Sequence, residues 1–165
     1  RGGLALVVFL LSGHNRGAGD WGLGLVCPRP WPALPCYADS CAAGLLEAVT
    51  YACVEERPVL FVAYDLPAPA PLSGARPIAS AFAAALVFVP RAEQVLATAD
   101  MTVTAAAGRD VSSAFSQEFE QLRLDNPAAR LLPVLQALAM ERRATINLNL
   151  LDDQRLIVEV ECGHR

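Results

Sequence analysis

The residue best placed to do chemistry is Cys41, which lies where a predicted strand turns into a predicted helix. A cysteine attacks as its thiolate, and the N–H groups and dipole at a helix N-terminus lower the pKa of a thiol. The small residues 42–44 leave room for a substrate carbonyl beside backbone N–H groups that could stabilise an oxyanion. The pattern therefore predicts an acyl-accepting thiol. A small apolar residue at a tight helix start explains the same pattern, and the spacing alone favours this second interpretation.

A thiol nucleophile also needs a base or an oxyanion partner, and the chain offers few. His14 is the only histidine away from the chain end, because His164 is one residue from it. His14 and Asn15 stand at the head of the glycine-rich segment 12–24 and fit better as residues that cap or pin this loop. Asp65 lies just past the carboxyl end of a predicted strand, where α/β proteins place their sites, although capping the next loop is the simpler role. Beside Cys41, the candidate binding or structural residues are His14, Asn15, Ser40, Gly44 and Asp65.

The cysteine pattern does not indicate a metal centre or a secreted disulfide framework. The five cysteines are an odd number and show no repeated Cys-x-x-Cys or Cys/His ligand spacing. The glycines of segment 12–24 lack the order of a phosphate-binding loop, and no lysine follows them. We therefore expect no metal and no cofactor.

The composition predicts one cytoplasmic domain over residues 1–165 with a large apolar core. Of the 165 residues, 54% are hydrophobic and 18% are charged, and the net charge is −4. All 13 positive charges are scattered arginines, which argues against nucleic-acid binding because a phosphate backbone needs a basic patch. The apolar run 4–11 is far shorter than the ~20 residues that span a bilayer. Such a chain buries its strands on both faces, or covers part of its surface with another subunit.

Hydrophobic periodicity predicts an α/β domain. A buried helix over 42–54, capped by Asp39 or Ser40, precedes a central strand over 59–64, and residues 4–11 form a buried strand or a buried helix. Asn126-Pro127 is an N-cap followed by a proline, and starts a helix that should run to about residue 143. We also expect a short strand over 34–38, a second buried strand over 81–89 and a third strand over 101–107, with a surface loop over 66–77. The stretch 108–125 predicts no element. A hairpin pairs 145–150 with 155–161 and turns at Asp152 and Asp153.

Five blocks of sequence, in this order and spacing, resemble the ketosynthase-like families of the thiolase fold. They are SGHNRGAGDWGLGL (12–25), DSCAAGLLEA (39–48), RPVLFVAYDLPAPAPL (57–72), FAAALVFVP (82–90) and NPAARLLPVLQALA (126–139). The group most resembled is that of the β-ketoacyl synthase N-terminal-domain-like, or chain-length-factor-like, proteins. In ketosynthases a Cys-Ala-Ser/Thr-Gly block holds the acylated nucleophile at an elbow, and residues 41–44 fall on it. The resemblance implies a partial thiolase-like fold, the N-terminal half of a ketosynthase, with buried central strands, a cysteine elbow leading into a buried helix, and a C-terminal helix plus β-hairpin.

The departures from the family pattern bear on activity. Ketosynthases draw two histidines from glycine-rich motifs in the second half of the duplicated fold, and this sequence has neither motif. The sequence also begins close to its 12–25 block, so we expect the family's first strands and helix to be missing. Decarboxylative condensation needs those histidines to stabilise the enolate, so the chain alone should not perform it.

The resemblance implies an accessory, non-catalytic subunit. It would act in a heterodimer with a ketosynthase on chains bound to acyl carrier protein, in fatty acid, polyketide or aryl polyene biosynthesis. The alternative is an acyltransferase or residual 3-oxoacyl synthase with Cys41 as its nucleophile, and a reactive Cys41 would separate the two. A third interpretation is a degenerate chain that folds poorly alone, which the absence of a cooperative melt would support.

Overall fold

Among the described residues, the first sheet has three strands. The computed structural model describes residues 6–11, 40–75, 77–90, 97–105, 110–151 and 153–162, so the short strand expected over 34–38 lies outside it. Strand β1 (Leu6–Leu11) runs parallel to β2 (Val59–Asp65), and β2 pairs with the antiparallel β3 (Phe82–Phe88), in the order β1-β2-β3. Of the two interpretations of the first apolar run, the strand is therefore confirmed.

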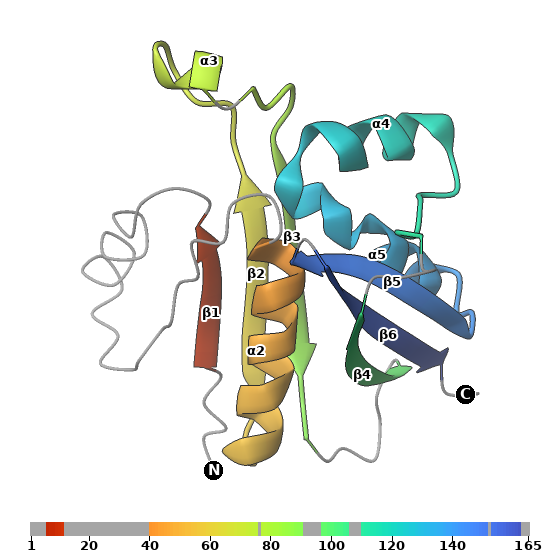
Figure 1. Cartoon of the computed structure of the whole chain (residues 1–165). Coiled ribbons are helices and arrows are strands. Elements are labelled where there is room, and N and C mark those ends of the chain that lie inside the picture. The colour runs from red at the N-terminus through yellow and green to blue at the C-terminus, as the bar shows by residue number, and fades with distance from the viewer. Residues whose placement is uncertain are drawn as a thin grey trace.

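Helix α2 (Ser40–Val54) lies across one face of this sheet, against β1 and β2, as Figure 1 shows. Four of its buried side chains recur every three or four residues, namely Cys41, Leu45, Ala48 and Ala52, and Ala42 is buried beside them. Because most of them are small, the helix axis can come close to the sheet. The prediction of a buried helix holds for this face only, since the opposite face leaves Tyr51 37% and Val54 73% exposed.

Strand β3 corrects one expectation, because it is not a buried strand. It pairs with β2 at one end of the strand order, and its residues alternate between partly buried and exposed positions. One set, which includes Phe82 and Phe88, packs against the core, and the Phe88 ring centroid lies 6.4 Å from that of Phe61. The other set points outward, with Val87 60% exposed. A continuous apolar run does not reveal this difference, because it looks the same in a central strand and at an edge.

The second sheet is antiparallel throughout, with the order β4-β6-β5. Strands β5 (Ala144–Leu151) and β6 (Gln154–Cys162) form the expected hairpin, with a turn that includes Asp153. The expected third strand is confirmed as β4 (Ala97–Ala105), which pairs with β6. Alternate residues of β5 and β6 are buried, as their alternating sequence predicts.

Three helical segments between β4 and β5 depart in part from the expectation. The stretch without a predicted element contains α4 (Gln117–Asp125), whose N-cap Ser116 accepts a hydrogen bond from the Phe119 N–H. The helix start at Asn126-Pro127 is confirmed, but its first turns are the 3₁₀ helix η2 (Pro127–Leu131), followed by α5 (Leu132–Ala139). Pro133 explains this break, because it has no N–H to donate to the carbonyl four residues earlier.

Two boundaries are also corrected. Helix α5 ends at Ala139 rather than near residue 143, because the N–H groups of Met140, Glu141 and Arg142 turn back onto carbonyls of its last turn, with a positive φ of 50° at Glu141. The loop expected over 66–77 contains a one-turn helix, α3 (Leu72–Ala75).

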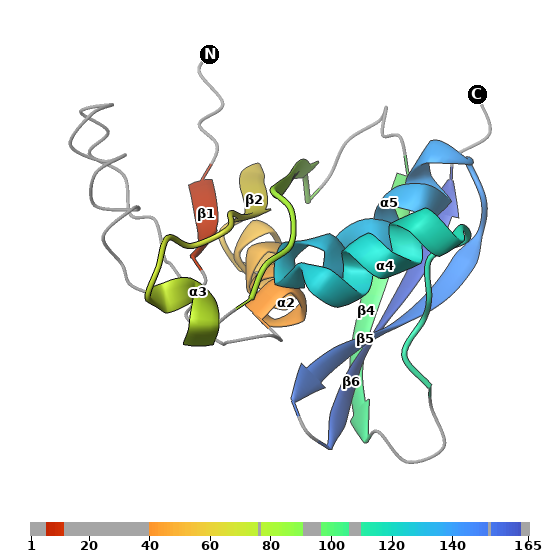
Figure 2. The same ribbon diagram turned by 90° about the horizontal axis from the view of Figure 1, so that it is seen from above.

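Among the residues that the structure describes, one apolar cluster joins both sheets through α2, η2 and α5. Figure 2, seen from above, shows α4 and α5 on the same side of the molecule, with α5 beside the second sheet that it contacts. Among the described residues, no helix is both long enough and apolar enough to cross a membrane.

Candidate functional site

Asn126 connects three parts of the chain around the candidate site, and its side chain is fully buried. Its Oδ1 accepts hydrogen bonds from the N–H groups of Ala128 (2.9 Å) and Ala129 (3.4 Å), which caps η2. Its Nδ2 donates to the carbonyls of Ser80 (2.8 Å) and Asp65 (3.4 Å). These bonds fix η2 against the end of β2 and the residues just before β3.

Cys41 lies in the first turn of α2 and is 4% exposed. Its Sγ lies 3.8 Å from the carbonyl oxygen of Ala128, to which the thiol donates a weak hydrogen bond. Burial raises the pKa of the Cys41 thiol from 9.0 to about 12, against a smaller lowering by the positive charge of Arg130. The helix start was expected to lower this pKa, and the structure shows the opposite because desolvation of the thiolate outweighs the favourable charges.

A cavity of about 270 Å³ lies beside Cys41. It is formed by the start of α2, α4, η2, β5 and the residues that precede α4. Its lining residues are Cys41, Ala42, Val111, Arg123, Leu124, Arg130, Leu148 and Asn149. The cavity is mostly apolar, with two guanidinium groups at its wall, so it can enclose a small group close to the thiol.

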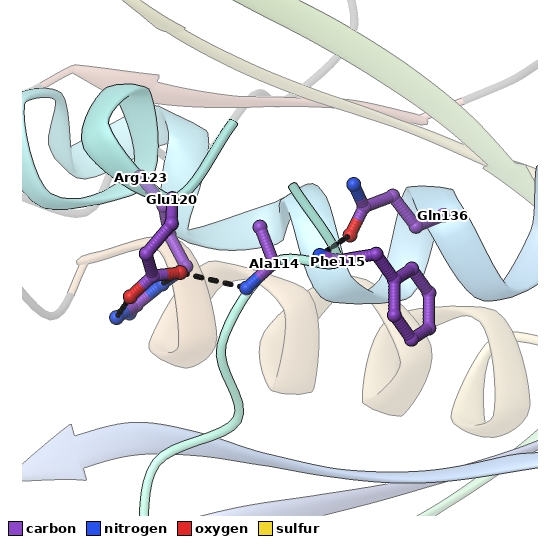
Figure 3. A network of polar contacts seen from close by, with 5 residues as sticks. All are labelled: Ala114, Phe115, Glu120, Arg123 and Gln136. Atoms are coloured by element: carbon purple, nitrogen blue, oxygen red, sulfur yellow. Dashed lines mark hydrogen bonds and ion pairs between the residues drawn. The ribbon is translucent and has the colours of Figure 1, made fainter. Parts of the chain in front are cut away.

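Arg123 at this cavity is held by a network that Figure 3 shows. Its Nε and Nη2 donate to the two carboxylate oxygens of Glu120, at 2.8 and 2.6 Å. Glu120 also accepts a hydrogen bond of 2.7 Å from the Ala114 N–H, and Gln136 accepts one of 3.1 Å from the Phe115 N–H. The bonds from Arg123 and Ala114 lower the pKa of Glu120 from 4.5 to about 2. The network therefore fixes both the guanidinium and the segment before α4.

The structure places the other sequence-predicted site residues as follows. Ser40 is the first residue of α2, and Gly44 is buried one turn later. Asp65 is buried at the end of β2. The pKa of Tyr64 is raised mainly by burial of its side chain and to a smaller extent by the negative charge of Asp65. Cys41 and Asp65 are thus both bonded to the start of η2. The Cys41 thiol donates to the Ala128 carbonyl, and the Asp65 carbonyl accepts from the side chain of Asn126, the N-cap of η2. His14 and Asn15 lie outside the described residues.

Sequence reasoning missed Arg123 and Arg130 as neighbours of Cys41. The Glu120–Arg123 pair has the i,i+3 spacing of a helical ion pair, so its signal was present in a stretch where no helix was predicted. Arg130 carries no such signal, because only the fold brings η2 to the start of α2. Within the part of the chain that the structure describes, no three metal-ligating side chains come together.

The chain belongs to the family of the β-ketoacyl synthase N-terminal domain, whose model matches residues 5–147. This range contains α2, η2 and all residues that line the cavity beside Cys41 except Leu148 and Asn149. The family resemblance of the sequence is therefore confirmed. No curated protein matches the chain.

The structure is similar to that of a ketosynthase (ApeO) in complex with its chain length factor (ApeC) from Xenorhabdus doucetiae, with a TM-score of 0.51 and 20% identity. The match covers 88% of this chain and 53% of that one, so the chain spans about half the length of its structural neighbour. The likeness confirms the expected fold class, an α/β fold of the thiolase-like ketosynthase type over this part.

Proposed function

We propose that this chain is an accessory, non-catalytic ketosynthase-like subunit of the chain-length-factor type. It acts with a ketosynthase, as a heterodimer, on acyl chains carried by acyl carrier protein. The reaction that it assists belongs to fatty acid, polyketide or aryl polyene biosynthesis. The family membership and the likeness to a ketosynthase complex support this proposal.

The state of Cys41 is the observation that carries the proposal. With a pKa of about 12, roughly one thiol in 10⁵ is ionised at pH 7, because each pH unit below the pKa lowers the thiolate fraction tenfold. The proton of this thiol is directed at the Ala128 carbonyl, and no described residue is a histidine that could remove it. A residue in this state serves the packing of α2 against η2 better than acyl transfer.

One observation favours the alternative, an acyltransferase or residual 3-oxoacyl synthase. Cys41 borders a cavity that also presents Arg130, whose charge lowers the pKa of the thiol. In this alternative the thiolate attacks a thioester carbonyl, a new carbon–sulfur bond forms, and the carrier thiol leaves with a proton. Ionisation of Cys41 on substrate binding would be required.

Intact-mass analysis after incubation with acyl-CoA and acyl-carrier-protein thioesters separates the two functions. The wild-type chain, Cys41→Ser and Cys53→Ser should be compared, because Cys53 is an exposed thiol on the same helix. We expect no stable adduct on Cys41 in a sample whose near-UV circular dichroism shows a folded chain. Acylation that is lost in Cys41→Ser and kept in Cys53→Ser would overturn the non-catalytic proposal.

A second assay tests the accessory role directly. The chain and its Cys41→Ala variant are added to a ketosynthase that makes little or no product alone, with acyl carrier protein and substrate. We expect both forms to raise product formation equally and to comigrate with the ketosynthase in size-exclusion chromatography. No comigration and no change in product with either form would contradict the accessory function.

A further inference from the structure

A groove runs along the face of α2 that points away from the first sheet. Its volume is about 650 Å³. It is lined by Ala43, Leu46, Glu47, Thr50, Tyr51 and Val54 of α2, by Glu55 just after the helix, and by Leu150 and Leu151 of β5. At 100° per residue, this stripe of α2 lies opposite the buried stripe that contains Leu45 and Ala48. The sequence of α2 therefore has two apolar faces. The first is buried against the core, and the second is half-buried at Ala43 and Leu46 and exposed at Tyr51 and Val54.

The groove is apolar and also contains a carboxylate that lacks a described partner. The Oε2 atom of Glu47 is buried, and no described residue donates a hydrogen bond to it. Burial raises the pKa of Glu47, as expected for an acid without a donor. Glu55, at the end of the same stripe, is already paired with Arg57. Whatever covers the groove gains most if it carries a positive charge opposite Glu47.

The walls of the groove indicate the shape of its occupant. A helix forms one wall and the end of β5 forms the other, so the open side is a trough along α2. Side chains spaced three and four residues apart on a second helix can enter such a trough as ridges enter grooves. A volume of about 650 Å³ also lies within the range of small-molecule pockets. An acyl chain, however, has no hydrogen-bond donor for Glu47, whereas a polypeptide can supply one.

We propose that the groove between α2 and the end of β5 docks an amphipathic helix of a partner polypeptide, which covers Leu46 and Val54 and places one lysine or arginine against Glu47. The proposal rests on the proposed function in one respect, that the chain works with a partner polypeptide, and it names the surface used. The exposed Tyr51, Val54 and Leu151 then lie at the interface rather than in water.

Two synthetic helical peptides test this surface without any ketosynthase. Both have 18 residues, acetylated and amidated ends, and a leucine stripe, and one of them replaces the central leucine by lysine. Binding is measured by fluorescence anisotropy. We expect the lysine peptide to bind the wild-type chain at least about tenfold more tightly than the leucine peptide, as a charge-assisted hydrogen bond would give.

Variants assign the binding to the groove. Glu47→Gln should remove the preference for the lysine peptide, whereas Glu118→Gln, on the exposed face of α4, should keep it. Thr50→Trp fills the groove from an exposed helix position and should weaken both peptides at least about tenfold, whereas Thr50→Ala should not. Far-UV circular dichroism identifies any variant that does not fold.

Three outcomes would overturn the proposal. The first is equal binding of the two peptides to the wild-type chain, and the second is binding that Thr50→Trp leaves unchanged. The third is a self-associated wild-type chain in sedimentation velocity that Thr50→Trp converts to monomer, which would make a second copy the occupant. Failure of the peptides together with success in the ketosynthase assay would remove the groove and leave the proposed function in place.

Discussion

Replacing Asn126 by alanine tests whether η2 is anchored in the way that the hydrogen bonds indicate. The substitution removes the acceptor that caps the N–H groups of Ala128 and Ala129, and the donor that serves the carbonyls of Ser80 and Asp65. Both N–H bonds and the bond to Asp65 are buried, so water cannot replace them at once.

The expected loss of stability follows from these bonds. Loss of an N-cap costs about 1 kcal/mol, and up to about 2 kcal/mol in folded proteins. A buried carbonyl without its donor costs about 1 to 3 kcal/mol. The contact at 3.4 Å is near the long limit of a hydrogen bond and counts for less than the one at 2.8 Å to Ser80. We therefore expect Asn126→Ala to lower the free energy of unfolding by about 3 kcal/mol.

Urea unfolding followed by far-UV circular dichroism measures this loss. With an m-value of about 2 kcal/mol/M, the midpoint should fall by about 1.5 M at an unchanged m-value. Ser116→Ala is the matched control, because Ser116 caps α4 with a single exposed hydrogen bond and its loss should cost less than about 1 kcal/mol. A shift for Asn126→Ala no larger than that for Ser116→Ala would refute the anchoring role.

Asn126→Asp separates the two halves of the interaction. Aspartate keeps the acceptor for η2 but turns the donor into an anion that faces the carbonyls of Ser80 and Asp65. Its pKa should be raised by burial, so the variant should gain stability as pH falls through that pKa and lose it at neutral pH. A variant as stable as the wild type at pH 7 would show that only the cap matters.

The remaining predictions concern single ionisable groups. Iodoacetamide at pH 7.5 should modify exposed Cys53 at least about 100-fold faster than buried Cys41, as timed peptide mapping would measure, and equal rates in the folded chain would contradict the buried thiol. The pKa of Glu120 is lower in the folded chain than in the unfolded chain, so ionised Glu120 stabilises the fold above pH 4.5, and this stability is lost as the pH falls to about 2. In urea unfolding at a series of pH values, Glu120→Gln should flatten the dependence of the midpoint on pH over this range, whereas Glu118→Gln should not. The pKa of Glu47 is raised in the folded chain, so the chain loses stability as the pH rises through that pKa. Glu47→Gln should remove this loss. If the urea midpoint of Glu47→Gln at pH 7 were lower than that of the wild type, ionised Glu47 would have a hydrogen-bond donor.

The elements that the sequence predicts well are those that one physical signal decides. A continuous apolar run identifies β2, alternation identifies the β5–β6 hairpin, and Asn126-Pro127 marks the start of η2, whereas the run that contains β1 fits a strand or a helix equally. Helix α4 was not predicted, because its sequence is charged and shows no clear apolar stripe. The helix is supported by the Ser116 cap and the Glu120–Arg123 ion pair. The end of α5 was predicted too late, because the residue with positive φ that follows the helix is Glu141 and not a glycine.

In the candidate site, too, local sequence predicts some features and only the fold determines the others. The position of Cys41 at a helix start is local information, and the sequence contains it. The burial of Cys41 is not local, because the carbonyl that it contacts belongs to a residue 87 positions further along the chain. The rise of its pKa comes from burial by segments that are distant in the sequence, so only the fold reveals that desolvation of the thiolate outweighs the helix N-terminus.

The small residues that follow Cys41 illustrate how one pattern serves two functions. Small side chains allow a substrate to approach a nucleophile, and they equally allow two pieces of backbone to pack closely. Here Ala42 is buried and the Ala128 carbonyl accepts the hydrogen bond of the Cys41 thiol, so the small side chains allow η2 to pack against the start of α2. The buried bonds of Asn126 hold η2 in this position, and a substrate would have to reach Cys41 through the cavity that α2 and η2 border. A cysteine held in this way fits a structural role, and the partly exposed apolar face of α2 is the surface that we propose for a partner helix.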